Sequence, residues 1–395
     1  MFTLSKRLLP VVSFLLFSAV YASVSATQDT VEKAVFEHSK ALKHAAVLLK
    51  TTIKNEHFKF AVGSANREKK TEAEVDAPFP IGSASKVFVG VSIFQLIEAG
   101  KLSLETKLST FYAKGSIQNL ANYKGKNYFS DVTVGMLLQH TSGFIDYLNI
   151  YKDDAKAIEV YTKNGDHYSF EDIMKFAVDF GDANFKPGTQ FSYSNTGYII
   201  LGDIVKKISG EDWRDYVQKH ILDTLALKHT YFGTRLSKTV KGTMPQGYFL
   251  GKATDMPYSL ASSAGEIVST VDDLSTFISA WGEGKLYTDP KTLKVQMTEG
   301  FHAMSPDIAN ISYGYAIMNV GGLFGHGGQT FGFQSYMAIR PGTDESIALG
   351  INESEGQAMV LMMKVMGVSY EFQQSNTPIT EKARKKKVKR AETAE

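Results

Sequence analysis

The chain has 395 residues, a length that allows one large core or two packed lobes. Hydrophobic residues make up 43% of it and charged residues 21%, which excludes a disordered chain and a bundle of membrane helices for its body. Because the sequence contains no cysteine, disulfides, a thiol nucleophile and a lipidated N-terminal cysteine are also excluded.

The two ends of the chain differ from its body. Lys6 and Arg7 precede an apolar run over 8–20, and small residues follow it, so residues 1–26 are predicted to be a secretory signal cleaved after Ala22 or Ala26. The end of the chain, 371–395, is predicted to be a disordered tail, with seven basic and two acidic residues in its last part, 382–395. We therefore expect a secreted, periplasmic protein whose tail can touch anionic membrane or cell-wall polymer, and no nucleic-acid partner.

Hydrophobic periodicity predicts the elements in chain order. A helix is expected over 31–43, a hairpin of strands over 45–53 and 58–62, and a helix over 87–99 that ends at Gly100. Residues 101–264 contain mostly helical patterns, among them a helix over 196–209 that ends at Gly210. Four strands are expected over 313–320, 323–327, 334–340 and 346–352, and a last helix over 356–366.

These elements predict an α/β (α+β) fold in which both ends of the chain join one antiparallel sheet with flanking helices. The sheet lobe is expected over about 27–100 and 265–370, with a mainly helical lobe inserted over about 101–264. Residues 27–370 would thus form one domain between the signal and the tail.

The strongest chemical motif is Ser83-x-x-Lys86 at the start of an apolar helix. Three residues of helix return a side chain to nearly the same face, so the amine of Lys86 would lie beside the hydroxyl of Ser83 and assist its deprotonation. The helix N-terminus would favour the oxyanion that follows attack. The plain alternative is that Ser83 is only a helix N-cap and Lys86 a surface lysine.

Two further segments carry candidate groups. In Tyr193-Ser194-Asn195, Tyr193 is a candidate general acid or base, and Asn195 a partner of the substrate or of Lys86, or else a helix N-cap. Tyr147-Leu148-Asn149 has the same spacing, so the spacing alone is weak evidence. In the glycine-rich strand 324–333, His326 is expected to orient Tyr193 or to couple to it through a proton.

Taken together, these three motifs resemble the serine β-lactamase and penicillin-binding protein family, in its class C β-lactamase-like branch. Supporting matches lie at 137–143 and 264–274, and the resemblance covers about residues 40–365. It implies that Ser83 is the acylated nucleophile, Lys86 its partner, Tyr193 the base and then the acid, and Asn195 a ligand of the acyl group. His326, Gly327 and Gly328 replace the family's Lys-Thr-Gly strand, and the N–H groups of Ser83 and Gln329 would form the oxyanion hole.

The same resemblance implies the function. We expect an exported serine hydrolase that acts on a small-molecule or peptide substrate, an amide or ester such as a D-alanyl peptide, a β-lactam or a small ester. Because His326 replaces a lysine, recognition of a substrate carboxylate is not expected to follow the usual pattern. No cofactor and no metal site are implied, and the motifs of α/β-hydrolases and of zinc metallohydrolases are missing. A non-catalytic binding or regulatory protein with the same fold remains the alternative.

Overall fold

A computed structural model describes residues 28–112, 115–148, 159–163, 165, 167–255, 257–306 and 308–369. The predicted signal segment and the predicted basic tail lie outside these residues. Among the residues described, no helix is both long and apolar enough to cross a membrane.

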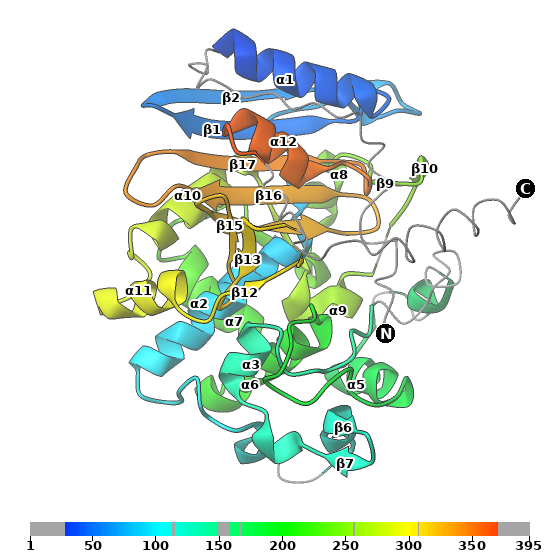
Figure 1. Ribbon diagram of the computed structural model, residues 1–395. Coiled ribbons are helices and arrows are strands. Elements are labelled where there is room, and N and C mark those ends of the chain that lie inside the picture. Colours follow the sequence, from blue (N-terminus) through cyan, green and yellow to red (C-terminus); the bar gives the residue numbers. More distant parts are fainter. Residues whose placement is uncertain are drawn as a thin grey trace, which may run out of the picture.

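The largest element is an eight-stranded antiparallel sheet with the strand order β12-β13-β14-β15-β16-β17-β1-β2 (Figure 1). β1 pairs with β17, which comes almost 300 residues later, so the two ends of the described chain meet in one sheet, as predicted. The strands are β1 (Val47–Ile53), β2 (Glu56–Val62), β12 (His302–Ala303), β13 (Ile311–Tyr313), β14 (Met318–Val320), β15 (Leu323–Gln329), β16 (Gln334–Ile339) and β17 (Ser346–Ile351).

Alternating side chains of the sheet enter two different cores. Leu48 of β1 packs into the larger core, whereas its neighbours Val47 and Leu49 pack into a smaller one, as expected when successive strand residues point to opposite faces. Helices α1 (Gln28–Ala41) and α12 (Ala358–Val365) cover the smaller core. On the other face, α10 (Val271–Gly282) packs on β1, β16 and β17.

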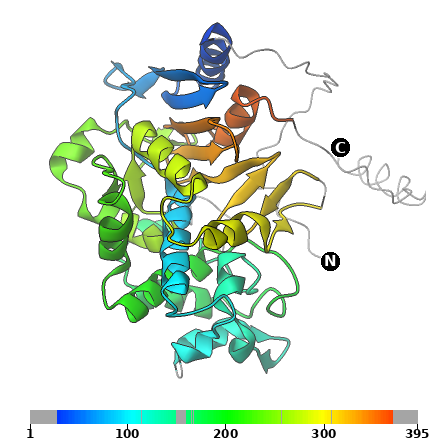
Figure 2. The ribbon, with the colours of Figure 1, turned by 90° about the vertical axis from the view of Figure 1, so that its left-hand side faces the viewer.

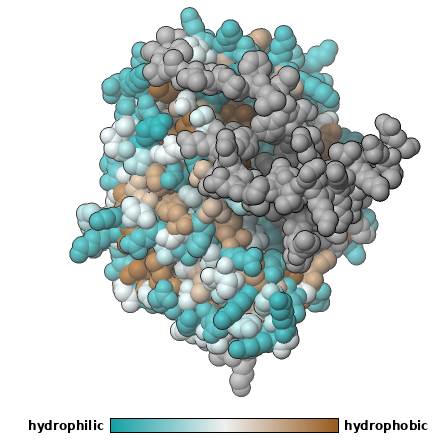
Figure 3. Space-filling model, viewed as in Figure 1, coloured by the Kyte–Doolittle hydropathy of each residue, from teal (hydrophilic) through white to brown (hydrophobic). Residues whose placement is uncertain are grey.

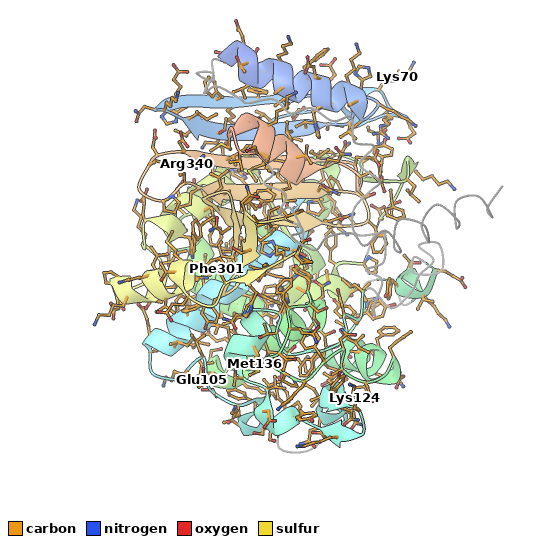
Figure 4. The ribbon with its side chains drawn as sticks, in the orientation of Figure 1. Lys70, Glu105, Lys124, Met136, Phe301 and Arg340 are labelled. Carbon is orange, nitrogen blue, oxygen red and sulfur yellow. The ribbon has the colours of Figure 1, made fainter. Side chains whose placement is uncertain are left out.

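The middle of the chain is mainly helical, and α2 (Ser85–Glu98) connects it to the sheet. α2 contacts both β15 and α6, and it runs through the centre of the molecule in Figure 2. Figure 4 labels Met136, which lies on α3 in the helical part, and Arg340, which lies beside β16 in the sheet. The further helices are α3 (Val134–Leu138), α5 (Phe170–Asp179), α6 (Asn195–Ser209), α7 (Trp213–Val217), α8 (Lys238–Thr243), α9 (Tyr258–Ala261) and α11 (Pro290–Thr298).

Short strands outside the large sheet form several smaller sheets. Three of them form a small sheet in the order β5-β11-β8, and two others form the β9-β10 hairpin. A further two hairpins are short as well. The bounds are β3 (Ser64–Asn66), β4 (Thr71–Glu72), β5 (Phe79–Pro80), β6 (Asn122–Tyr123), β7 (Lys126–Asn127), β8 (Tyr231–Phe232), β9 (Tyr248–Phe249), β10 (Lys252–Ala253) and β11 (Ile267–Ser269).

Local sequence explains where several elements begin and end. Lys54 and Asn55 both have positive φ, the two-residue turn that matches the twist of a hairpin, and they join β1 to β2. Gly210 ends α6 in the left-handed conformation, as the sequence predicts. The outer face shown in Figure 3 mixes hydrophilic and apolar residues wherever it is not drawn in grey.

One predicted element was wrong. The strand expected over 313–320 is two strands, β13 and β14, which pair with each other. The chain reverses between them because Ala316 adopts a positive φ and the N–H of Gly314 donates to the carbonyl of Ile317 at 2.8 Å. Because apolar residues continue on both sides of this turn, the hydrophobic periodicity does not indicate it.

Candidate active site

The candidate nucleophile lies on a sharp connection between β5 and α2. Gly82 has a φ of +53°, a conformation that glycine adopts at low cost, and Ser83 follows in a single turn of 3-10 helix. Ser83 is partly accessible, whereas both of its neighbours are buried. Ala84 is the N-cap of α2, so Ser83 does not fill that position.

Lys86 is fully buried in the first turn of α2 and has three polar partners. Its Nζ lies 3.0 Å from the Oγ of Ser83, 2.7 Å from the Oδ1 of Asn195 and 2.6 Å from the carbonyl oxygen of Ala264. Two of these partners are carbonyl-type oxygens that can only accept hydrogen bonds, but the Ser83 hydroxyl can also donate. When Lys86 loses a proton, its lone pair therefore faces Ser83.

The small sheet explains why the carbonyl of Ala264 reaches Lys86. β11 begins three residues after Ala264 and pairs with β5, which leads into Ser83. The N–H of Ile81 also donates to the carbonyl of Ile267 at 2.9 Å. These backbone bonds hold residues 264–267 against residues 79–86, although the two segments are far apart in sequence.

Asn195 is not an N-cap, because Ser194 occupies that position of α6. Its side chain points into the protein, where its Nδ2 donates to both carboxylate oxygens of Asp146, at 3.1 and 3.0 Å. Its Oδ1 is thereby turned toward Lys86. The expected bond between Asn195 and Lys86 is present, and its role toward a substrate stays a prediction.

Burial controls the charges of this group. It lowers the pKa of Lys86 to about 7, while the nearby Asp146 acts in the opposite direction. Burial also raises the pKa of the Asp146 carboxyl. Lys86 is thus available as a neutral amine near neutral pH, which a solvated lysine is not.

Tyr193 lies beside the pair formed by Ser83 and Lys86. The Nζ of Lys86 is 5.0 Å from the centre of the Tyr193 ring. Burial raises the pKa of Tyr193 well above its usual value, while interaction with Ser83 lowers it, although the two hydroxyls do not lie at hydrogen-bond geometry. The expected role of Tyr193 as base and then acid stays a prediction.

His140 is a site residue that the sequence did not single out. Its Nδ1 accepts a hydrogen bond from the N–H of Ser194 at 3.1 Å, and its carbonyl accepts one from the N–H of Ser192 at 2.9 Å. Its ring lies 4.1 Å from that of Tyr193, between centroids. His140 therefore holds the backbone on both sides of Tyr193 by hydrogen bonds. It lies within the matched run 137–143, which was the only signal for it.

The His326 ring lies 6.5 Å from the Tyr193 ring, between centroids, and its expected role toward Tyr193 stays a prediction. Its Nε2 lies 2.9 Å from the Tyr313 hydroxyl, and its Nδ1 bonds the carbonyl of Gly327. A carbonyl accepts only, so Nδ1 carries the proton and Nε2 accepts from Tyr313. Burial lowers the pKa of His326 to about 3, so this ring is neutral.

Strand β15 brings Gly328 and Gln329 against the nucleophile turn. A Cβ on Gly328 would lie 1.7 Å from the carbonyl oxygen of Ile81, and one on Gly82 would lie 2.7 Å from the backbone nitrogen of Gln329. Only glycine permits such an approach of two backbones. The N–H groups of Ser83 and Gln329 are thereby placed in neighbouring segments, and the oxyanion hole that they would form stays a prediction.

Tyr147, the tyrosine of the second Tyr-x-Asn motif, serves a structural purpose. Tyr147 is buried, and its hydroxyl donates to the carbonyl of Leu260 at 2.5 Å. Asn149 lies outside the described residues. Within the described part of the chain, no group of three or more His, Cys, Asp or Glu side chains could hold a metal ion.

Comparison with known proteins places this geometry in a family. The family model described as Beta-lactamase matches residues 19–364. Penicillin-binding protein 4 of Amycolatopsis lactamdurans is 26% identical over 312 residues, which cover 74% of this chain and 76% of that protein. Protein flp of Staphylococcus aureus (strain MW2) is 31% identical over 170 residues, 43% of this chain, and the match spans only 31% of that longer relative.

Solved structures share the fold. A D-stereospecific amidohydrolase from Streptomyces sp. superposes with a TM-score of 0.73 at 23% identity, covering 87% of this chain and all of that one. The octameric penicillin-binding protein homologue from Pyrococcus abyssi gives a TM-score of 0.71 at 24% identity, covering 86% and 78% of the two chains. With the family match over most of its length, this chain belongs to the β-lactamase family.

Proposed function

We propose that this protein is a serine hydrolase that forms an acyl-enzyme on Ser83. The observation that carries the proposal is the set of bonds around Lys86, in which two carbonyl-type oxygens leave only the Ser83 hydroxyl able to give a proton to the amine. The lowered pKa of Lys86 supports the same role, because a useful base has a pKa near the working pH.

The first step uses the 3.0 Å contact between Ser83 Oγ and Lys86 Nζ. Ser83 Oγ attacks the substrate carbonyl carbon while its proton passes to Lys86 Nζ, and the resulting oxyanion is held by the N–H groups of Ser83 and Gln329. The bond to the leaving amine or alcohol then breaks, and the proton returns to the leaving group from Lys86 through the Tyr193 hydroxyl. Water hydrolyses the Ser83 ester in the second half of the reaction, with the same groups acting in reverse.

We favour an amide or ester substrate of a D-configured residue over a β-lactam. The structural neighbours include a D-stereospecific amidohydrolase and a D-amino acid amidase. In addition, His326 is neutral and both of its ring nitrogens have partners, so it supplies no cation for a carboxylate at this strand. Export remains part of the proposal and rests on residues 1–26, outside the described residues.

The test is intact-mass analysis and product assay with D-phenylalanine amide, p-nitrophenyl acetate and benzylpenicillin, for the protein and for Ser83→Ala. We expect turnover of the amide or the ester, little consumption of penicillin, and loss of every reaction in Ser83→Ala. Turnover that persists in Ser83→Ala would refute the role of Ser83. An intact Ser83 that reacts with none of the three would favour the non-catalytic binding protein instead.

A further inference from the structure

Asp146 is a buried carboxylate next to the candidate active site, and no sequence motif assigned it a role. It lies in the segment that follows α3 and is only 7% exposed. Placing a carboxylate in such a position is costly unless hydrogen bonds and an opposite charge compensate it.

Its bonds point to Asn195. The carboxylate accepts from the side-chain Nδ2 of Asn195 with both oxygens and from the backbone N–H of Asn195 at 3.3 Å. The backbone N–H of Leu148 also donates to it at 3.1 Å. A carboxylate offers only acceptors, so the amide of Asn195 must present its NH₂ to Asp146 and its oxygen to Lys86. If the Asn195 amide were rotated by half a turn, its NH₂ group would face the N–H groups of Lys86, and donors would oppose donors.

The charge of Asp146 also acts on Lys86. The titratable groups that face Lys86 come from several elements: Asp146 and His140 after α3, Tyr193 before α6, Tyr198 on α6 and His326 on β15. The two histidines are held neutral by burial, which lowers the pKa of each. The pKa values of both tyrosines are raised well above the usual value. Of these groups, Asp146 alone supplies a negative charge.

We infer that Asp146 is a positioning residue that acts through Asn195, fixing the orientation of its amide and opposing the loss of the proton from Lys86. The inference rests on the proposed function. It assigns Asp146 no contact with substrate. Asp146 instead keeps the Lys86 amine directed at Ser83 and sets the pH at which this amine becomes a base.

The test compares Asp146→Asn and Asp146→Glu by the pH dependence of kcat/KM for p-nitrophenyl acetate hydrolysis. Asparagine keeps the shape but removes the charge, so the pKa of Lys86 falls further and the acidic limb of the profile moves down by about one pH unit. We also expect kcat to fall at least about tenfold, because the Asn195 amide loses its fixed orientation. Asp146→Glu retains the charge, so the acidic limb of its pH profile should stay near that of the unmodified protein.

Asp273→Asn is the matched control. Asp273 is buried to a similar degree, accepts a bond from the N–H of His229 at 2.8 Å and lies outside the site, so its variant should leave the profile unchanged. The inference is wrong if Asp146→Asn keeps the kcat and the acidic limb of the unmodified protein. It is also wrong if both Asp146 variants lose activity equally and neither shifts the acidic limb of the pH profile. An Asp146→Asn variant that is folded but inactive, beside an active Asp146→Glu, supports it. Hydrolysis that survives in Ser83→Ala refutes the proposed function instead, so the two failures are distinct.

Discussion

At the scale of single residues, the proposed reaction depends on the protonation state of Lys86. Its three partners are arranged so that both the charged and the neutral amine are fully bonded: the ammonium donates to all three, and the neutral amine donates to two and accepts from Ser83. Proton transfer between Ser83 and Lys86 therefore needs no rearrangement of the site. Such preorganisation is what lowers a barrier most effectively in a buried environment.

The buried Lys86 also makes stability depend on pH. Its pKa is about 7 in the folded protein, compared with about 10.4 in an unfolded chain, so between these values the unfolded state binds more protons. The free energy of unfolding should then rise with pH over this interval, by up to about 1.4 kcal/mol per pH unit.

Lys86→Met removes this contribution and should abolish hydrolysis. Urea unfolding at pH 7, 8 and 9 should show a smaller increase in stability with pH for Lys86→Met than for the unmodified protein. Lys101→Met, at an exposed position, serves as the control and should keep the original slope. Equal slopes in all three proteins would show that Lys86 is charged in the folded state throughout this range.

At the scale of elements, the decisive contact is that of β15 with the turn that carries Ser83. Ser335 on the adjacent strand β16 supports this contact, because its Oγ donates to the carbonyl of Ile81 at 2.7 Å. Gly328 lies against that same carbonyl. A side chain at this position of the strand would push Ser83 away from Gln329.

Gly328→Ala should therefore harm both stability and activity. We expect the free energy of unfolding to fall by about 1–3 kcal/mol, the usual cost of forcing extra atoms into a packed site. The loss of kcat should exceed what the unfolded fraction explains. Gly242→Ala is the control, since no atom lies within 4 Å of its added Cβ and a helical alanine is favoured over glycine. Chemical denaturation and kcat are measured on both variants. An active, fully stable Gly328→Ala would show that β15 does not need glycine at this position to approach the Ser83 turn.

At the scale of the whole molecule, the site exists only where distant parts of the chain meet. Ser83 comes from the 3-10 turn before α2 and Lys86 from α2 itself. Asn195 comes from α6, Ala264 from the segment before β11, and Gly328 from β15. One continuous apolar core joins these elements, and it includes residues of α2, α6, α10 and the sheet. The sheet and the helical part should accordingly unfold together.

Phe88→Ala tests this coupling. Phe88 of α2 is buried and stacks on Phe277 of α10, with ring centroids 3.6 Å apart. Its truncation should lower the free energy of unfolding by about 3–5 kcal/mol. Loss of activity and loss of circular dichroism should share one urea midpoint. Phe36→Ala, at a half-exposed position of α1, should have little effect. Two separated midpoints would mean that the sheet and the helical part unfold independently.

The sequence by itself determined the elements that local chemistry specifies. Apolar periodicity followed by a glycine predicted α2 and α6 within a few residues, and the alternating runs predicted most strands of the sheet. The turn inside 313–320 was missed because apolar residues continue through it. Ser83 and Lys86 were also readable, since three residues of helix fix their separation.

Only the tertiary structure decided which further groups join this pair. Asp146 and His140 are 49 and 54 residues from their partners near Tyr193, and no spacing rule connects them. The choice between the two Tyr-x-Asn motifs and the partners of His326 likewise depended on packing. The physical reason is that the pKa values of Lys86, Asp146 and His326 depend mainly on burial, which belongs to the folded protein and to no short stretch of its sequence.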